Sequence, residues 1–170
     1  MNCFFMERIL VGNIIRHIII CEVLNVIDYS LVKLNDSNIV ELEKLRINAY
    51  QMDFDDMSIN NTFFAKGLRC GKYIVFGAYL DNKLVGACYV SNIYNSLFID
   101  RLFVLKSLQK SGYHIGTNLL KYVLNNKSVV EEYFNEKFSV SMLENEVLNS
   151  SIYKNLGYED TSSFVQRKHL

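Results

Sequence analysis

The segment Val104-Leu-Lys-Ser-Leu-Gln109-Lys-Ser-Gly112-Tyr-His-Ile-Gly116-Thr-Asn-Leu-Leu120 joins two different patterns within a few residues. An apolar, strand-type run from Leu97 to Leu105 leads into a polar turn with glycines, and the turn opens into an amphipathic helical pattern. The first N–H groups of a helix have no partners within the helix and lie at the positive end of its dipole. Glycine lets an anion approach the backbone closely. The order strand, glycine turn and helix therefore predicts a site for a phosphorylated cofactor.

The spacing within this turn excludes two common nucleotide-binding loops. The nucleotide-binding P-loop ends in Gly-Lys-Ser/Thr, whereas Gly116 is followed directly by Thr117. The dinucleotide fingerprint requires three glycines in the pattern G-x-G-x-x-G, and the turn offers only Gly112 and Gly116. A phosphate site of another class is therefore expected.

A second motif follows further along the chain. Residues 137–144 alternate like a strand, and residues 146–156 are typical of a helix. The helix ends in Ile152-Tyr153-Lys-Asn-Leu156-Gly157-Tyr158, where Gly157 suits the left-handed conformation that ends many helices.

The two motifs together resemble those of the GCN5-related N-acetyltransferases, the GNAT family. The run Gln109-Lys-Ser-Gly112-Tyr-His114 is similar to their acetyl-CoA loop, Gln/Arg-x-x-Gly-x-Gly/Ala, except that a histidine stands at the third anchor. This departure implies a loop two residues longer than usual, in which Gly116 takes the close-approach role. The segment from Ile152 to Tyr158 resembles the family's Leu-Tyr-x-x-x-Gly-Phe signature. The resemblance covers roughly residues 28–170.

The resemblance implies an α/β fold with a mixed, mostly antiparallel central sheet and helices on both faces, in the order β-α-α-β-β-β-α-β-α-β. The sequence pattern agrees with this order. Strands are expected at residues 29–34, 73–80, 83–91, 97–105, 137–144 and 163–169, and helices at 37–49, 62–68, 115–124 and 146–156. Asn35, Asp36 and Ser37 are N-cap candidates for the first helix, and Asp81-Asn82 is a hairpin turn.

The chain is predicted to consist of a domain and an N-terminal extension. Residues 28–170 are predicted to form one acetyl-CoA-dependent N-acetyltransferase domain, and residues 1–27 an N-terminal extension of unclear role. The extension is strongly apolar, but Arg16 and Glu22 interrupt it and make it a poor membrane span. It also lacks a small-residue cleavage site after a short apolar core, so a secretory signal is not expected.

The composition narrows the class of protein further. Lys+Arg and Asp+Glu both number 18, so the formal net charge is zero and a nucleic-acid binder with a clustered basic face is disfavoured. Cys3, Cys21, Cys70 and Cys88 lack metal-ligand spacing and indicate reduced thiols in a cytoplasmic protein. The three histidines are scattered, so no metal is expected.

The resemblance implies acetyl-CoA as co-substrate and assigns candidate residues to it. The pantetheine would bond to the backbone of Leu102, Phe103 and Val104, although the side chains of Leu102 and Val104 would equally suit a core. The pyrophosphate would lie on the loop made of Gln109, Lys110, Ser111, Gly112, Tyr113, His114, Ile115, Gly116 and Thr117. Asn145 and Asn149 are candidates for further pantetheine contacts, and Asn145 would equally serve as a helix N-cap.

Three residues are candidates for the chemistry. Tyr153 matches the tyrosine that protonates the departing thiolate in many family members; the alternative is a buried aromatic on the final helix. Asp100 lies in an apolar strand, two residues before Leu102, and is expected on the same face as a base for the amine. An ion pair with a neighbouring strand or with Arg101 explains Asp100 equally well. Glu144 is a competing base or substrate anchor.

The function expected is transfer of an acetyl group to a primary amine by direct attack in a ternary complex, because no cysteine occupies the positions of Tyr153 or Asp100. The acidic and aromatic segment 50–56 suits a small cationic amine, and surface solvation explains it equally well. The rivals are a catalytically silent acyl-CoA-binding module and a toxin-type aminoacyl-tRNA acetyltransferase. Expected partners are a small-molecule amine and, as an option, a second copy in a homodimer, with neither nucleic acid nor membrane.

Overall fold

The computed structural model describes residues 10–11, 14–15, 26–52, 59, 61–144, 150–160 and 165–170. The strands are β1 (Leu10–Val11), β2 (Ile14–Ile15), β3 (Ile27–Leu31), β4 (Ile74–Leu80), β5 (Lys83–Ile93), β6 (Ser96–Val104), β7 (Val140–Glu144), β8 (Glu159–Asp160) and β9 (Val165–His169). The helices are α1 (Asp36–Tyr50), α3 (Phe63–Arg69), the 3₁₀ helix η1 (Lys106–Leu108), α4 (Ile115–Asn125), α5 (Lys127–Phe134) and α6 (Ser150–Asn155).

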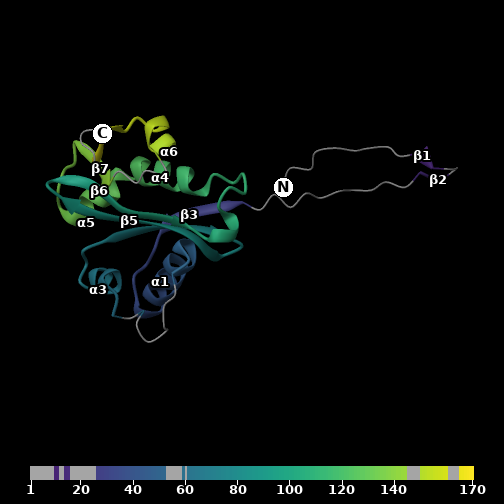
Figure 1. Cartoon of the computed structure of the whole chain (residues 1–170), viewed down its shortest axis with the longest axis horizontal. Coiled ribbons are helices and arrows are strands. Elements are labelled where there is room, and N and C mark those ends of the chain that lie inside the picture. Colours follow the sequence, from purple (N-terminus) through teal and green to yellow (C-terminus); the bar gives the residue numbers. More distant parts are fainter. Residues whose placement is uncertain are drawn as a thin grey trace.

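One central sheet organises the described part of the chain. Its seven strands lie in the order β3-β4-β5-β6-β7-β9-β8, and every neighbouring pair is antiparallel except β6 and β7, which are parallel. Helices α1 and α3 cover one face of the sheet, and α4 and α6 lie on the other (Figure 1). The predicted mixed, mostly antiparallel sheet with helices on both faces is confirmed. Strands β1 and β2 pair with each other in a separate two-stranded sheet.

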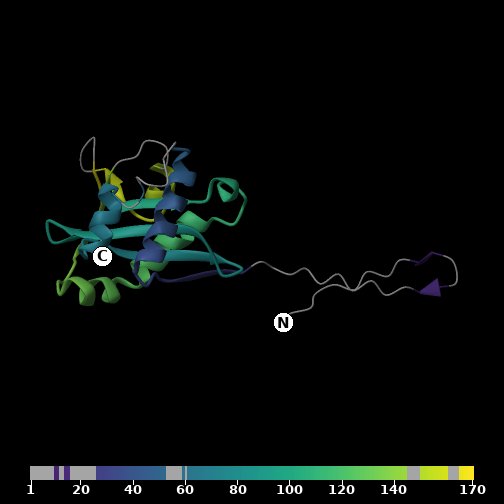
Figure 2. The same ribbon diagram turned by 90° about the horizontal axis from the view of Figure 1, so that it is seen from below.

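Each face of the sheet carries its own hydrophobic core. On one face Ile115, Leu119 and Val123 of α4 are buried against β4, β5 and β6. On the other, Leu42 and Leu45 of α1 pack with aromatic residues of the strands. Figure 2 looks onto the face that α1 and α3 cover. Because both faces are covered, the central strands are apolar along nearly their whole length rather than alternating.

Several local features match the sequence prediction. Asn35 caps α1, since its side chain accepts a hydrogen bond from the Asn38 N–H at 2.9 Å. Asp81 and Asn82 form the β4–β5 turn with φ values of 49° and 61°, the left-handed conformation that such hairpin turns require. Gly157 ends α6 with a φ of 84°.

Other features differ from the prediction. Helix α5 was not expected, because it follows α4 after the single turn residue Asn126. The strand β8 was not expected either, because a strand of two residues shows no periodicity in the sequence. The strand predicted over residues 137–144 begins only at Val140. The Phe138 N–H donates to a carboxylate oxygen of Glu131 on α5 at 2.9 Å, which holds this residue outside the sheet.

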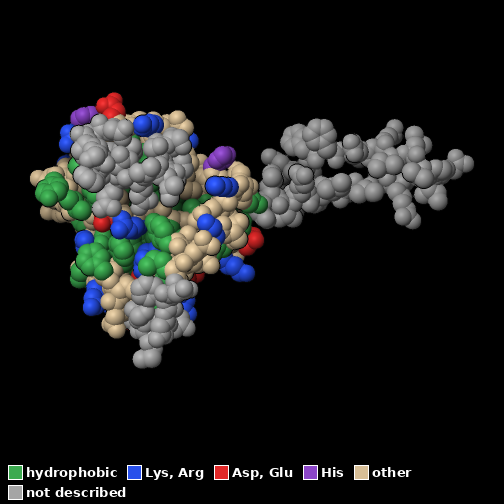
Figure 3. Space-filling view, in the orientation of Figure 1, with side chains coloured by type: hydrophobic (Ala, Val, Ile, Leu, Met, Phe, Trp, Pro, Cys, Tyr) green, Lys and Arg blue, Asp and Glu red, His purple; other side chains and the backbone are tan. Residues whose placement is uncertain are grey.

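Charged and hydrophobic side chains are mixed on the surface of the described residues (Figure 3). On the face seen in Figure 3, lysine and arginine side chains are dispersed among hydrophobic ones. No helix in the described part of the chain has the length and hydropathy needed to span a bilayer.

Candidate active site

Strand β6 is paired along only part of one edge. It runs parallel to β7 from Leu97, opposite Ser141, to Ile99, opposite Leu143. Strand β6 continues to Val104, whereas β7 ends at Glu144. Within the described residues, no strand pairs with this edge of β6 beyond Ile99. An extended ligand can therefore bind there as an added strand.

The pairing with β5 determines which backbone groups face this open edge. The Leu105 N–H donates to the Val85 carbonyl at 2.7 Å, so alternate residues of β6 point toward β5 or away from it. By this alternation Leu102 and Val104 face the open edge, and Phe103 faces β5. The Gln109 side chain already donates to the Val104 carbonyl at 2.9 Å. The backbone of Leu102 and the Val104 N–H are thus the groups suited to the predicted pantetheine contacts.

The loop after β6 holds an unusual number of left-handed residues. Lys110, Gly112 and His114 have φ values of 62°, 86° and 51°, all in the left-handed region. A Cβ on Gly112 would meet no atom within 4 Å, so its position opens to free space. Gln109 also donates to the Ala49 carbonyl at 3.3 Å, which ties the loop to α1. The loop is therefore anchored at Gln109 and open to free space at Gly112.

The loop leads directly into the N-terminus of α4. The first helical hydrogen bond runs from the Asn118 N–H to the His114 carbonyl at 2.9 Å. The N–H groups of Ile115, Gly116 and Thr117 therefore have no acceptor within the helix and form the positive end of its dipole. The first turn contains no acidic residue. This end of α4 is suited to an anion.

Gly116 brings this helix end close to β6. A Cβ on Gly116 would lie 3.7 Å from Val104 Cγ2 and 4.0 Å from Leu102 Cδ2. The anion site and the open edge of β6 are therefore neighbours. Residues 109–114 are exposed, whereas the Ile115 side chain is buried in the core, so only its backbone can contribute.

Asp100 lies in a β-bulge. Its neighbours Ile99 and Arg101 pair with the adjacent β5 residues Val90 and Tyr89, which leaves Asp100 without an opposite residue. The Ser91 hydroxyl donates to the Asp100 carboxylate.

The expectation that Asp100 shares a face with Leu102 is wrong. Ser91 alternates with Val90, which packs on the α4 side as Leu102 does. The carboxylate bonded to Ser91 is therefore on the α1 and α3 side. The bulge changes the strict alternation on which the expectation rested.

Tyr153 of α6 is buried, with 5% of its surface exposed, in the core cluster that also receives Leu102 and Val104. Its ring lies 6.1 Å from that of Tyr158, whose hydroxyl shares a 2.6 Å hydrogen bond with Ser141. Burial raises the pKa of Tyr158, and the bond to Ser141 opposes this. Both the catalytic interpretation of Tyr153 and the core interpretation fit this position.

Three candidate residues cannot be placed fully. Asn145 and Asn149 lie outside the described residues. Glu144 ends β7, next to the parallel pairing with β6, and its side chain is also outside the described part. The described residues contain no cluster of three or more potential metal ligands.

A buried polar network that the sequence pattern does not predict lies next to this site. Glu43 is fully buried and accepts hydrogen bonds from Arg46 at 3.0 Å, from the Thr62 hydroxyl at 2.6 Å and from the Tyr89 hydroxyl at 3.4 Å. It joins α1, the N-cap of α3 and strand β5. The three-residue spacing of Glu43 and Arg46 was a signal for an ion pair, but not for its burial.

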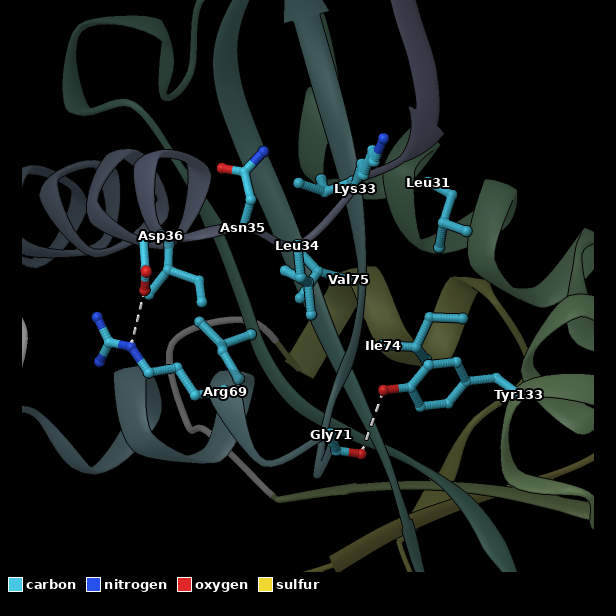
Figure 4. A pocket seen from close by; sticks show the side chains of 13 residues that line it. Leu31, Lys33, Leu34, Asn35, Asp36, Arg69, Gly71, Ile74, Val75 and Tyr133 are labelled. Carbon is cyan, nitrogen blue, oxygen red and sulfur yellow. Dashed lines mark hydrogen bonds and ion pairs between the residues drawn. The ribbon is translucent and has the colours of Figure 1, made fainter.

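A pocket of about 680 Å³ lies elsewhere, between the β3–α1 connection, α3 and α5. At its rim Asp36 pairs with Arg69 at 3.1 Å, and the Tyr133 hydroxyl donates to the Gly71 carbonyl at 3.2 Å (Figure 4). None of its lining residues belongs to the segment from Asp100 to Thr117. It is therefore separate from the open edge of β6.

The element order, the partly paired strand and the loop that opens into a helix N-terminus define an acetyltransferase fold. A family model described as "Acetyltransferase (GNAT) domain" matches residues 42–170. The chain belongs to the GNAT acetyltransferase family. This membership makes it a transferase of the acetyl-CoA-dependent class.

Solved structures agree with this fold. An acetyltransferase from Streptococcus agalactiae is 14% identical with a TM-score of 0.62, over 85% of this chain and 98% of the other. The PaiA N-acetyltransferase from Thermoplasma acidophilum, in complex with coenzyme A, is 16% identical with a TM-score of 0.59, over 84% and 99%. Naa50 of Arabidopsis thaliana, in complex with the bisubstrate analogue CoA-Ac-MVNAL, is 22% identical with a TM-score of 0.57, over 84% and 99%. No curated protein matches the chain in sequence.

Proposed function

We propose that the chain transfers an acetyl group from acetyl-CoA to a primary amine by direct attack in a ternary complex. The observation that carries this proposal is the open edge of β6, which lies directly beside the N-terminus of α4. Acetyl-CoA has an anionic pyrophosphate joined to an extended, amide-containing arm. These two parts match an anion site and a free strand edge placed next to each other.

The loop supplies the pyrophosphate site in this proposal. The N–H groups of Gly112 to Thr117 donate hydrogen bonds to the phosphate oxygens. Gly112 has a φ of 86°, a left-handed conformation that suits glycine. The pantetheine then lies along the β6 edge, where its amides bond to Leu102 and to the Val104 N–H. Asn145 and Asn149 are further candidates for contacts to this arm.

The chemistry follows from the direction of this arm. With the pyrophosphate at α4, the thioester end lies toward the bulge at Asp100. The Asp100 carboxylate takes a proton from the incoming amine, directly or through water, and Glu144 is the alternative base. The neutral amine attacks the thioester carbon, the C–S bond breaks, and the nitrogen loses its second proton to water, which also restores the proton that the tyrosine gives up. The Tyr153 hydroxyl gives its proton to the departing thiolate.

The proposal also covers the domain boundaries, the cellular environment and the partners of the chain. Residues 28–170 form the catalytic domain, and residues 1–27 an extension to it. The exposed free thiol of Cys70 is consistent with a reducing, cytoplasmic environment. A small-molecule amine is the expected acceptor, and a homodimer is compatible with the proposal.

The proposal is tested by mixing the purified chain with acetyl-CoA and a panel of primary amines. Released CoA is measured with a thiol reagent, and the acetylated amine by mass spectrometry. Amine-dependent release of CoA, equal in amount to the acetylated product, is expected. Binding of acetyl-CoA without any amine-dependent release would instead identify a catalytically silent acyl-CoA-binding module.

A further inference from the structure

Glu43 is a buried carboxylate that no step of the proposed mechanism uses. Its side chain is fully buried, and its partners among the described residues are all hydrogen-bond donors. The Arg46 guanidinium donates at 3.0 Å, the Thr62 hydroxyl at 2.6 Å and the Tyr89 hydroxyl at 3.4 Å. A charge is buried at a high cost in free energy unless such partners surround it. The contribution of Glu43 therefore lies in the groups that it holds in place.

One of these groups is the start of α3. The Thr62 hydroxyl donates to Glu43 and accepts the Ala65 N–H at 3.0 Å, so it both donates and accepts a bond. Thr62 is the N-cap of α3, and Phe64 lies in the first turn of that helix. The carboxylate of Glu43 thus fixes the point at which the Phe64 side chain projects from α3.

Two guanidinium groups lie over the Phe64 ring. The Arg46 Cζ is 5.0 Å from the ring centroid, and the Arg101 Cζ is 5.1 Å from it. Glu43 holds Arg46 through Nε at 3.2 Å and Nη2 at 3.0 Å. Arg101 belongs to β6 and stands opposite Tyr89 of β5. Because a cation is attracted to the face of an aromatic ring, the network extends from α1 through Phe64 to β6.

Arg101 contacts the proposed base directly. Its Nη1 donates to the backbone carbonyl of Asp100 at 2.6 Å. Asp100 is the bulge residue that the pairing with β5 passes over, so the regular ladder does not fix its orientation. The Ser91 hydroxyl holds the carboxylate of this residue, and Arg101 holds its backbone. The orientation of Asp100 therefore depends on where the Arg101 guanidinium lies.

We propose that Glu43 positions Asp100 for proton transfer, an inference that rests on the proposed function. The connection runs through the Phe64 ring and the two guanidinium groups over it. Because Glu43 is fully buried, it acts through these neighbours and not on the substrate. A base must lie within hydrogen-bond reach of the proton that it takes, so a small displacement of Asp100 slows this step. The binding of acetyl-CoA at the edge of β6 and the end of α4 does not depend on this displacement.

The variant Glu43→Gln tests this inference, with the amine of the panel that gives the highest turnover as the probe. The side chain keeps its size, but its NH2 group faces donors and cannot accept their bonds. We expect kcat to fall about tenfold. The KM for the amine, and the Kd for acetyl-CoA measured by calorimetry, should stay unchanged.

A double-mutant cycle with Asp100→Asn shows whether the effect passes through the base. In the Asp100→Asn background there is no base to position, so Glu43→Gln should leave kcat unchanged. If the two effects instead multiply, Glu43 does not act through Asp100, and the inference falls while the proposed acetyl transfer stands.

Phe64→Leu provides a second test, which holds even where Glu43→Gln fails to fold. It removes the ring that both guanidinium groups contact and keeps an apolar side chain of similar size. The same fall in kcat and the same coupling to Asp100→Asn are expected. Effects that multiply in this cycle overturn the inference as well.

Glu131→Gln is the matched control, because Glu131 is also a buried carboxylate and accepts bonds from the Phe138 N–H and the Lys137 ammonium. This control should lose stability and keep the wild-type kcat. An equal fall of kcat in the control would make a general loss of stability the cause and would overturn the inference. Absence of turnover in the wild type with every amine overturns the proposed function and this inference with it.

Discussion

The Ser91 hydroxyl donates a hydrogen bond to the carboxylate of Asp100, the one residue of β6 that the pairing with β5 passes over. The bulge separates Asp100 from the regular ladder and points its carboxylate to the α1 and α3 face. β-Bulges are frequent next to active sites, where they redirect a side chain. We propose that Asp100, in this position, takes the proton from the amine.

Asp100→Asn should retain the shape of the bulge and lose the base. We expect kcat/KM to fall about a hundredfold near neutral pH and to recover as pH rises, because the free amine then becomes abundant without help. The measurement is a pH–rate profile of CoA release. Wild-type rates at every pH would assign Asp100 to structure alone.

Gly112→Val should weaken acetyl-CoA binding. A side chain here would occupy the open centre of the loop, and the φ of 86° is unfavourable for any residue with a Cβ. The Kd should rise at least about tenfold, which corresponds to roughly 1.4 kcal/mol.

Gly71→Val separates this effect from backbone strain. Gly71 has a φ of 74° and lies outside the loop. Both variants should lose about 1–2 kcal/mol of stability through the left-handed conformation. Only the loop variant should lose affinity in calorimetry. Equal Kd values for the two variants would remove the loop from the cofactor site.

The sequence predicts the parts of this fold that depend on local rules. The amphipathic pattern of residues 115–124, the Asp81-Asn82 turn and the Asn35 cap each rest on near neighbours, and the structure confirms them. The glycine loop before this helix also depends on residues that are near neighbours in the sequence.

The missed features depend on contacts between distant segments. The bulge at Asp100 arises from register between two strands, which period-two alternation cannot reveal. The bonds of Thr62 and Tyr89 to Glu43 need the folded sheet and helices. The pocket next to α5 depends on a helix that was not expected.

Glu131 should make stability depend on pH in the acid range. The Phe138 N–H and the Lys137 ammonium hold its carboxylate at 2.9 Å and 3.0 Å. The bond from the Phe138 N–H is the main cause that lowers the pKa of Glu131 to about 2. A depressed pKa stabilises the fold fully above the unfolded value of about 4.3, and this stabilisation is lost as pH falls toward 2.

Glu131→Gln should therefore lower the free energy of unfolding at neutral pH. Its difference from the wild type should shrink between about pH 4.3 and pH 2 in chemical unfolding experiments. Glu132→Gln, an exposed change on the same helix, is the control and should behave like the wild type. A difference that stays constant with pH would contradict the assigned role of the carboxylate.

Tyr153→Phe distinguishes the general acid from the core aromatic. If the hydroxyl protonates the thiolate, kcat should drop about a hundredfold while the Kd for acetyl-CoA stays unchanged. The free energy of unfolding should move by no more than about 1 kcal/mol. Unchanged kcat together with lower stability would leave Tyr153 a purely structural residue.

The central claim is that acetyl-CoA lies along the open edge of β6 and on the N-terminus of α4. Amide hydrogen exchange, followed by NMR with and without acetyl-CoA, tests it residue by residue. Exchange should slow at Leu102 and Val104 and across residues 112–117, and stay unchanged across residues 31–36, which line the separate pocket. Protection confined to residues 31–36, or absent from both the β6 edge and the loop, would contradict the account.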